Sequence, residues 1–208
     1  MQAPLPGEEA QYAMAPVNRK KQMAFNINDS VPRKSAVLAL LFPDHSEQTA
    51  LLLMKRAAGQ SVHSGQISFP GGQYEPQDKD LRDTALREAH EELGLISSQI
   101  KIIGRLTPIY ISPSNFNVIP FVGITFQKPV IKLNEEVDKV LIANIETLLV
   151  PEAKQTREIN VRNERLEVPC FIINHEIVWG ATAMMINELL TIIGQSKQSI
   201  FSKRPVKK

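Results

Sequence analysis

The sequence contains a single cysteine, Cys170, which rules out an internal disulfide framework and fits a reducing compartment. It also contains no apolar run near the ~18 residues that a membrane-spanning helix requires. Positive and negative charges nearly balance, and a formal net charge of +2 does not favour nucleic-acid binding by bulk electrostatics. The N-terminal stretch MQAPLPGEEAQ is acidic and lacks the basic and apolar regions of a signal peptide. We therefore expect a cytoplasmic protein with no nucleic-acid partner and no membrane partner.

The composition is that of a folded chain. Hydrophobic residues make up 43% and charged residues 22% of the 208 residues, which are ordinary values for a protein with a core. This length suits one domain with terminal extensions. Residues 1–34 contain Pro4, Pro6, Pro16 and Pro32 and no periodic apolar pattern, so we expect an N-terminal extension or arm. We expect the folded domain over residues 35–195 and a basic C-terminal tail over residues 196–208.

Apolar runs of strand length dominate the expected domain. Residues 35–42 and 49–56 are expected to pair as a hairpin across a polar turn. Asp80 and Gly94 carry the start and stop signals of a helix over residues 80–93. The remaining expected elements are strands in 99–112 and 117–126, a strand with a short helix over 139–150, a hairpin over 166–180 turning at Asn174–His175, and a last helix over 181–194. This order favours an α+β or layered α/β/α fold over a doubly wound sheet.

The helix expected over residues 80–93 carries carboxylates on one side. Glu88, Glu91 and Glu92 are spaced i, i+3 and i+4, so they fall on an arc about 100° wide. Carboxylates that lie close together raise one another's pKa values unless a positive charge lies among them. Arg87 can reach Glu91 at i+4 but brings a single charge. A divalent cation brings more, and oxygen ligands of this kind suit Mg²⁺ or Mn²⁺.

Two glycines, Gly71 and Gly72, precede this helix and allow the backbone to approach a ligand closely. A carbonyl of either glycine can therefore serve as a further oxygen ligand. Metal ions held here would bring a polyphosphate to an otherwise repellent acidic site and would activate water. For the stretch REAHEE alone, a surface helix with i,i+4 charge pairs is the more ordinary interpretation. The preceding glycines and the following Leu-Gly-Leu favour the metal site.

Residues 87–95 resemble the second half of the Nudix box, Arg-Glu-apolar-x-Glu-Glu-x-Gly-apolar. The first half departs from it, because the interval from Gly72 to Arg87 is one residue longer and the early glutamate position falls on Asp78. The resemblance implies a member of the Nudix hydrolase superfamily. It implies an α+β fold, the Nudix α/β/α sandwich with a mixed β-sheet core, and cleavage of a diphosphate that depends on Mg²⁺ or Mn²⁺.

The segment before the box is similar to that of the coenzyme A pyrophosphatases (CoA diphosphatases) of this superfamily. The matching residues are Leu52, Leu53, Arg56, Ala57, Gly65, Phe69, Pro70, Gly71 and Gly72. Met54 stands where that pattern has Thr, and Ser61 where it has a second Arg. His63 and Gln66 also resemble the bacterial members. The resemblance implies hydrolysis of coenzyme A or acyl-CoA to 3′,5′-ADP and (acyl-)4′-phosphopantetheine.

The residues and the resemblance together define an expected site. The metal ligands are expected to be Gly72, or Gly71 through its carbonyl, with Glu88, Glu91 and Glu92. Arg87 is expected to orient the carboxylates, and one of these glutamates or Glu136 to act as base toward the attacking water. The substrate-binding candidates are Arg56, His63, Gln66, Ser114 and Phe116. Ordinary alternatives stand beside them, such as a strand-end charge for Arg56 and a core position for Phe116.

Two other functions compete with this reading. One is a Nudix hydrolase of another nucleoside diphosphate derivative, such as ADP-ribose, a nucleotide sugar or a dinucleotide, because the second Arg is absent at Ser61. The other is a non-catalytic Nudix-fold module that binds a nucleotide. The presence of Glu88, Glu91 and Glu92 favours catalysis. The expected partner is a small-molecule nucleotide diphosphate, and a homodimer is left open.

Overall fold

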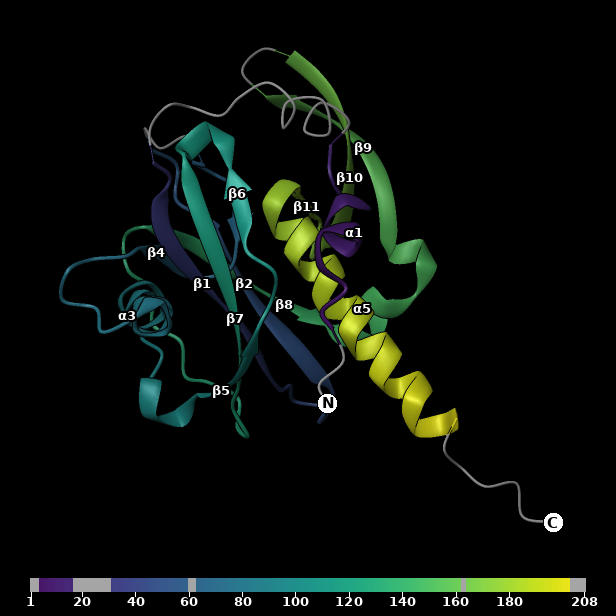
Figure 1. Cartoon of the computed structure of the whole chain (residues 1–208), viewed down its shortest axis with the longest axis horizontal. Coiled ribbons are helices and arrows are strands. Elements are labelled where there is room, and N and C mark those ends of the chain that lie inside the picture. The colour runs from purple at the N-terminus through teal and green to yellow at the C-terminus, as the bar shows by residue number, and fades with distance from the viewer. Residues whose placement is uncertain (1–3, 17–30, 60–62, 162–163, 203–208) are drawn as a thin grey trace.

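The computed structural model describes residues 4–16, 31–59, 63–161 and 164–202 (Figure 1). The strands are β1 (Arg33–Pro43), β2 (Thr49–Arg56), β3 (Ile67–Ser68), β4 (Gly71–Gln73), β5 (Lys101–Arg105), β6 (Ile109–Ile111), β7 (Phe116–Ile124), β8 (Val137–Asn144), β9 (Lys154–Val161), β10 (Glu164–Ile173) and β11 (Glu176–Trp179). The α-helices are α1 (Gly7–Tyr12), α3 (Leu81–Leu93), α4 (Ile145–Leu149) and α5 (Gly180–Ser202). The short 3₁₀ helices are η1 (Ser97–Gln99), η2 (Ser112–Ser114) and η3 (Pro151–Ala153). None of the helices in these ranges is both long and apolar enough to cross a bilayer.

Strand β1 lies inside a large mixed sheet. It pairs parallel with β7 and antiparallel with β2 and β4. β3 and β8 add to β2, and β5 and β6 add to β7. A second sheet has the order β11-β10-β9. The pairing of β1 with β2 confirms the hairpin predicted for residues 35–42 and 49–56. The pairing of β10 with β11, with positive φ at Asn174 and His175, confirms the second predicted hairpin.

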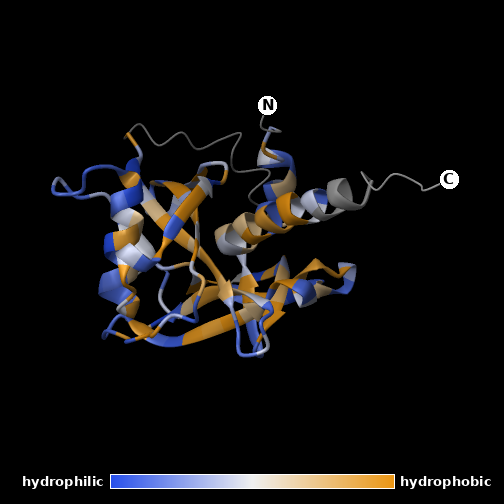
Figure 2. Cartoon of the chain, turned by 90° about the horizontal axis from the view of Figure 1, so that it is seen from below, coloured by the Kyte–Doolittle hydropathy of each residue, from blue (hydrophilic) through white to orange (hydrophobic). Residues whose placement is uncertain are grey.

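Helices cover both faces of the large sheet (Figure 1). α3 packs on one face, where Ala85, Ala89 and Leu93 are buried against the strands. α5 lies on the other face together with the second sheet. Figure 2 shows that hydrophobic residues are concentrated on the strands that lie between α3 and α5. This arrangement confirms the α+β fold class with a mixed sheet.

Helix α3 begins and ends where the sequence predicts. Asp80 caps the helix, since its Oδ1 accepts a hydrogen bond from the backbone N–H of Asp83 at 2.8 Å. Gly94 ends it in the left-handed region, with φ of 67°, which glycine adopts without strain. The strand and short helix predicted over residues 139–150 are present as β8 and α4.

Strand β9 and helix α5 differ from the expectations. β9 was not predicted, because it is the edge strand of the second sheet and its residues are largely exposed. Such a strand needs no strong apolar alternation, so it carries a weak sequence signal. α5 continues past residue 194 to Ser202, so residues 196–202 of the predicted tail are helical.

Part of the expected N-terminal arm, residues 10–15, packs against the folded domain. α1 lies against α5 (Figure 1), and Gln11 donates a hydrogen bond from Nε2 to Oε2 of Glu188 at 2.8 Å. Met14 is 2% exposed and belongs to the core beneath α5. Residues 17–30 lie outside the described residues, and the domain boundaries of 35 and 195 remain predictions.

Candidate active site

Gly71 and Gly72, which we call the glycine turn, begin strand β4 and lie against α3. β4 runs antiparallel to β1, and Gly71 has φ of 152°, which a side chain rarely tolerates. A Cβ added at Gly71 would lie 2.3 Å from the carbonyl oxygen of Ala36. A Cβ added at Gly72 would lie 2.3 Å from Oε1 of Glu88. The lack of a side chain therefore allows Gly71 to lie close to β1 and Gly72 to lie close to the Glu88 carboxylate.

Glu92 is the most deeply buried of the three α3 glutamates, with 2% of its surface exposed. Its Oε2 accepts a hydrogen bond from the Gly71 N–H at 2.8 Å, and its Oε1 lies 3.3 Å from Nη2 of Arg56. Burial raises the pKa of Glu92 to about 7, although Arg56 and the Gly71 N–H oppose this increase. Glu92 is thus a carboxylate that exchanges its proton near neutral pH.

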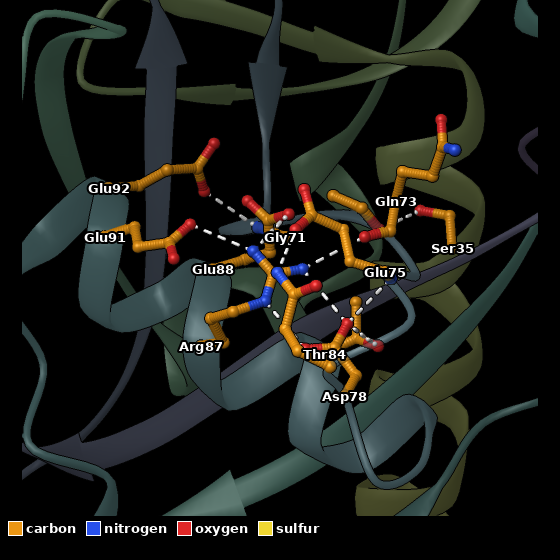
Figure 3. Close-up of polar contacts among 12 residues, drawn as sticks. Ser35, Gly71, Gln73, Glu75, Asp78, Thr84, Arg87, Glu88, Glu91 and Glu92 are labelled. Carbon is orange, nitrogen blue, oxygen red and sulfur yellow. Dashed lines mark hydrogen bonds and ion pairs between the residues drawn. The ribbon is translucent and has the colours of Figure 1, made fainter.

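Arg87 connects the carboxylates of α3 to the turn before it (Figure 3). Its Nη1 donates to Oε1 of Glu88 at 3.0 Å and to Oε2 of Glu91 at 2.9 Å, so the contact predicted at i+4 is present. Its Nη2 donates to the backbone carbonyl of Gln73 at 3.0 Å. Burial raises the pKa of Glu88, and Arg87 partly offsets that increase.

Asp78 anchors Arg87 from the other side (Figure 3). Its Oδ1 accepts from Nε of Arg87 at 2.7 Å, and its Oδ2 accepts from Thr84 Oγ1 and from the Glu75 N–H, both at 2.9 Å. The hydrogen bond from Arg87 is the largest of the effects that lower the pKa of Asp78 to about 2. The acid at the early position of the box therefore remains ionised and holds the arginine, although the intervening chain is one residue longer.

The donor chemistry of the site fits a hard divalent cation, which would sit among oxygen atoms. Glu92 is buried and Glu88 is half-buried, and the pKa values of both are raised, so additional positive charge would stabilise their anions. Within the described ranges, no three His, Cys, Asp or Glu side chains are gathered as a ready metal cluster. Arg87 holds two of the glutamates and the Gly71 turn holds the third. A cation would therefore replace some of these contacts.

Arg56 and its neighbours lie at the Gly71 end of the site. Arg56 donates from Nη2 to the Gly71 carbonyl at 3.0 Å, and its backbone N–H bonds to the Gln66 carbonyl at 3.0 Å. The Gln66 Oε1 lies 3.1 Å from Nδ1 of His63. The Glu136 carbonyl accepts from the N–H of Ala57, the residue after Arg56, at 2.8 Å. The structure thus brings Arg56, His63, Gln66 and Glu136 to one side of the glycine turn, while Ser61 lies outside the described residues.

Ser114 and Phe116 lie at the opposite end of β4. Arg33 stands over the Phe116 ring, with its guanidinium carbon 4.0 Å from the ring centroid, and donates to the Ser114 carbonyl. Phe116 is half-buried beneath this cation, so it is not a simple core residue. Arg33 itself was missed by sequence reasoning. Only the parallel register of β1 with β7, which pairs it with Phe116, brings the two residues together.

Solved structures of other proteins share this fold. A Nudix hydrolase from M. smegmatis, RenU, aligns with a TM-score of 0.53 at 14% identity, over 94% of this chain and 97% of that one. The MutT protein from Methanosarcina mazei Go1 aligns with a TM-score of 0.52 at 18% identity, over 80% and 98%. Likeness at these identities shows the fold alone.

Sequence relatives are more similar. Nudix hydrolase 22, chloroplastic, of Arabidopsis thaliana is 33% identical over 181 residues, which cover 84% of this chain and 60% of that protein. Nudix hydrolase 15, mitochondrial, of the same plant is 35% identical over 161 residues, covering 73% and 55%. An uncharacterized Nudix hydrolase NudL of Enterobacter sp. (strain 638) is 38% identical over 165 residues, covering 78% and 83%. The chain therefore spans little more than half the length of the two plant relatives.

The family match covers the site itself. The NUDIX domain matches residues 32–165, a range that includes β1, the glycine turn, α3 and the loop that carries Glu136. It extends over well more than half of the 208 residues, and the α3 carboxylates, Arg87 and the glycines all fall within it. The chain belongs to the NUDIX domain family.

Proposed function

We propose that the chain is a metal-dependent diphosphatase that hydrolyses the diphosphate of a nucleotide derivative. The observation that carries this proposal is the buried Glu92 carboxylate, which lies between the Gly71 N–H and Arg56. Glu88 lies beside it, against the backbone of Gly72. Burial of carboxylates costs free energy unless cations or hydrogen bonds compensate. A helix with a purely structural role has no need of two such acids at one glycine turn, whereas a site that holds metal ions against a diphosphate does.

The metal is proposed to be Mg²⁺ or Mn²⁺, because the candidate ligands are hard oxygen atoms. Glu88, Glu91, Glu92 and the Gly72 carbonyl would hold it. Ser35 donates from Oγ to this carbonyl at 2.6 Å, which fixes the orientation of the carbonyl. The bound metal would supply positive charge toward the phosphates and lower the pKa of a bound water.

The chain's own groups would position the reactants and accept a proton. Arg87 is proposed to orient Glu88 and Glu91, since Asp78 and the Gln73 carbonyl fix its guanidinium. One of the α3 glutamates or Glu136 would take the proton from the attacking water. Burial raises the pKa of Glu92 to about 7 in the absence of a metal, and a bound cation would lower this pKa again.

The substrate is proposed to be coenzyme A or an acyl derivative. The similarity of residues 52–72 to the coenzyme A pyrophosphatases supports this choice, and Arg56 with His63 and Gln66 supplies donors beside the acidic site. Water would add to one phosphorus of the diphosphate while the bond from that phosphorus to the bridging oxygen breaks. The products would be 3′,5′-ADP and (acyl-)4′-phosphopantetheine. A cytoplasmic location and a homodimer remain predictions.

A substrate panel tests the proposal. Coenzyme A, dephospho-coenzyme A, ADP-ribose and a diadenosine polyphosphate are each incubated with the full chain and Mg²⁺ or Mn²⁺, and the products are identified by mass spectrometry. We expect 3′,5′-ADP and 4′-phosphopantetheine from coenzyme A, and no turnover in EDTA. A much higher kcat/KM for ADP-ribose or the dinucleotide would contradict the coenzyme A assignment. Metal-independent turnover would contradict the metal site.

A further inference from the structure

Arg33, the first residue of β1, is held in a defined position although it is exposed. Its guanidinium carbon lies 4.0 Å from the centroid of the Phe116 ring. Its Nη1 donates to Oε1 of Gln73 at 3.1 Å, and its Nη2 donates to the Ser114 carbonyl at 2.9 Å. A long exposed side chain ordinarily samples many rotamers. These contacts restrict Arg33 to one orientation before any ligand arrives.

Among the described residues, no carboxylate offsets the charge of Arg33. Its hydrogen-bond acceptors are both neutral, and no Asp or Glu in the described part of the chain forms an ion pair with it. Arg87 and Arg56, by contrast, both pair with carboxylates. A guanidinium has five N–H groups, and the contacts to Gln73 and Ser114 use two of them. The others are available for an anion, and phosphate accepts such paired N–H groups.

Gln73 links Arg33 to the acidic site. Its side chain accepts from Arg33, while its backbone carbonyl accepts from Arg87. Arg56 contacts the other end of β4, at the Gly71 carbonyl. Because a strand advances about 3.3 Å per residue, Gly71 and Gln73, the residues that the two arginines contact, are roughly 7 Å apart along β4. Figure 3 shows Gln73 and Ser35 on one side of Arg87 and Glu92 on the other. Two cations therefore flank the glycine turn.

We propose that Arg33 and Phe116 form a subsite for a phosphate monoester of the nucleotide, separate from the diphosphate that is cleaved. The inference rests on the proposed hydrolysis of a nucleotide diphosphate at the acidic site. The metal ligands and Arg56 would take the diphosphate, and Arg33 would take a second phosphate beyond the Gln73 end of β4. A 3′-phosphate on the ribose is such a group. Coenzyme A carries one and ADP-ribose does not, so Arg33 would select between these substrate classes.

Binding measurements on the full chain test this subsite without requiring turnover. Adenosine 3′,5′-bisphosphate and adenosine 5′-monophosphate, which differ only in the 3′-phosphate, are titrated calorimetrically in EDTA. We expect the wild type to bind the bisphosphate about ten- to a hundredfold more tightly than the monophosphate, as a charge-assisted contact predicts. Arg33→Gln should remove this difference and leave the affinity for the monophosphate unchanged. Arg33→Lys keeps the charge but lacks the paired N–H groups of the guanidinium, so its ratio of the two affinities should be intermediate.

Arg165→Gln serves as the matched control, because Arg165 is an exposed arginine on the second sheet, ion-paired with Glu158. It should retain the wild-type ratio. The subsite is refuted if the wild type does not distinguish the two nucleotides, or if Arg33→Gln still does. An equal loss of affinity for both nucleotides in Arg33→Gln would assign Arg33 a structural role and also refute it. If Arg33→Gln removes the difference while coenzyme A is not hydrolysed, the subsite stands and the proposed substrate fails.

Discussion

Asp78 and Arg87 form the tightest ion pair of the site, with Oδ1 of Asp78 2.7 Å from Nε of Arg87. The Asp78 side chain is 1% exposed, and that of Arg87 is 18% exposed. Arg87 passes this anchoring on to Glu88 and Glu91, which its Nη1 contacts. Asp78 itself contacts none of the expected metal ligands. Through Arg87 it nevertheless determines the positions of two of them, Glu88 and Glu91.

Replacing Asp78 tests this relationship. Asp78→Asn is expected to lower the free energy of unfolding at pH 7 by roughly 1.5–3 kcal/mol, because a charged hydrogen bond is lost. The pKa of Asp78 is lowered from 3.8 to about 2 in the folded state, so the pair stabilises the fold above pH ~4 and this stabilisation is lost as the pH falls toward 2. Urea unfolding at pH 7, 4 and 3 should therefore show a difference in the free energy of unfolding between the wild type and Asp78→Asn, and this difference should become smaller as the pH falls. The kcat of the Asp78→Asn variant should fall about tenfold or more.

Glu167→Gln is the control for this variant, since Glu167 is exposed on β10 in the second sheet. It should match the wild type in both measurements. Unchanged kcat in a destabilised Asp78→Asn protein would show that Arg87 does not need this anchor to orient the glutamates.

Glu92→Gln should lower the turnover and raise the stability of the protein at pH 8. Turnover should fall at least about a hundredfold, because a metal ligand or proton acceptor is removed. The folded-state pKa of Glu92 is raised from 4.5 to about 7, so its ionisation destabilises the fold progressively between these pH values and fully above them. In EDTA, the variant should therefore be more stable than the wild type at pH 8 and nearly equal to it at pH 4. Near wild-type turnover at saturating Mg²⁺ would remove Glu92 from the site.

Gly72→Ala should abolish most activity while the protein still folds. The added methyl group would lie 2.3 Å from Oε1 of Glu88, so this flexible carboxylate must move away from the turn. The expected result is a large fall in kcat with a modest fall in Tm. Gly104→Ala is a suitable control, since a Cβ at this β5 position meets nothing within 4 Å. If Gly72→Ala kept full turnover, the close approach of backbone and carboxylate would have no catalytic role.

The N-terminal helix should matter for stability. Glu188 is fully buried and accepts hydrogen bonds from Gln11 Nε2 at 2.8 Å and from Thr107 Oγ1 at 2.6 Å. Gln11→Ala leaves Oε2 of Glu188 with only the longer hydrogen bond from the Thr107 N–H at 3.2 Å, which is expected to cost roughly 1.5–3 kcal/mol by urea unfolding. Glu9→Ala, on the exposed side of the same helix, should cost little. Equal stability of both variants would mean that the contact of α1 with α5 through Gln11 does not add to the free energy of unfolding.

Features that depend on neighbouring residues were determined by the sequence itself. The Asp80 cap, the Gly94 stop and the contact of Arg87 with Glu91 all form within one or two turns of α3. Their hydrogen-bond partners are three to five residues away, so chain geometry alone places them together. The fold class and the acidic arc followed from the same short-range periodicity.

Only the tertiary structure decided the contacts between distant segments. The packing of α3 on the large sheet brings Glu92 to Arg56, and strand register brings Arg33 to Phe116. The packing of α5 brings Glu188 to Gln11, 177 residues away. No local pattern specifies such partners, because each depends on how separate elements pair and pack. The same reason explains the N-terminal segment. Its few apolar residues show no periodicity, yet Met14 is buried because α5 and the large sheet provide a surface that covers it.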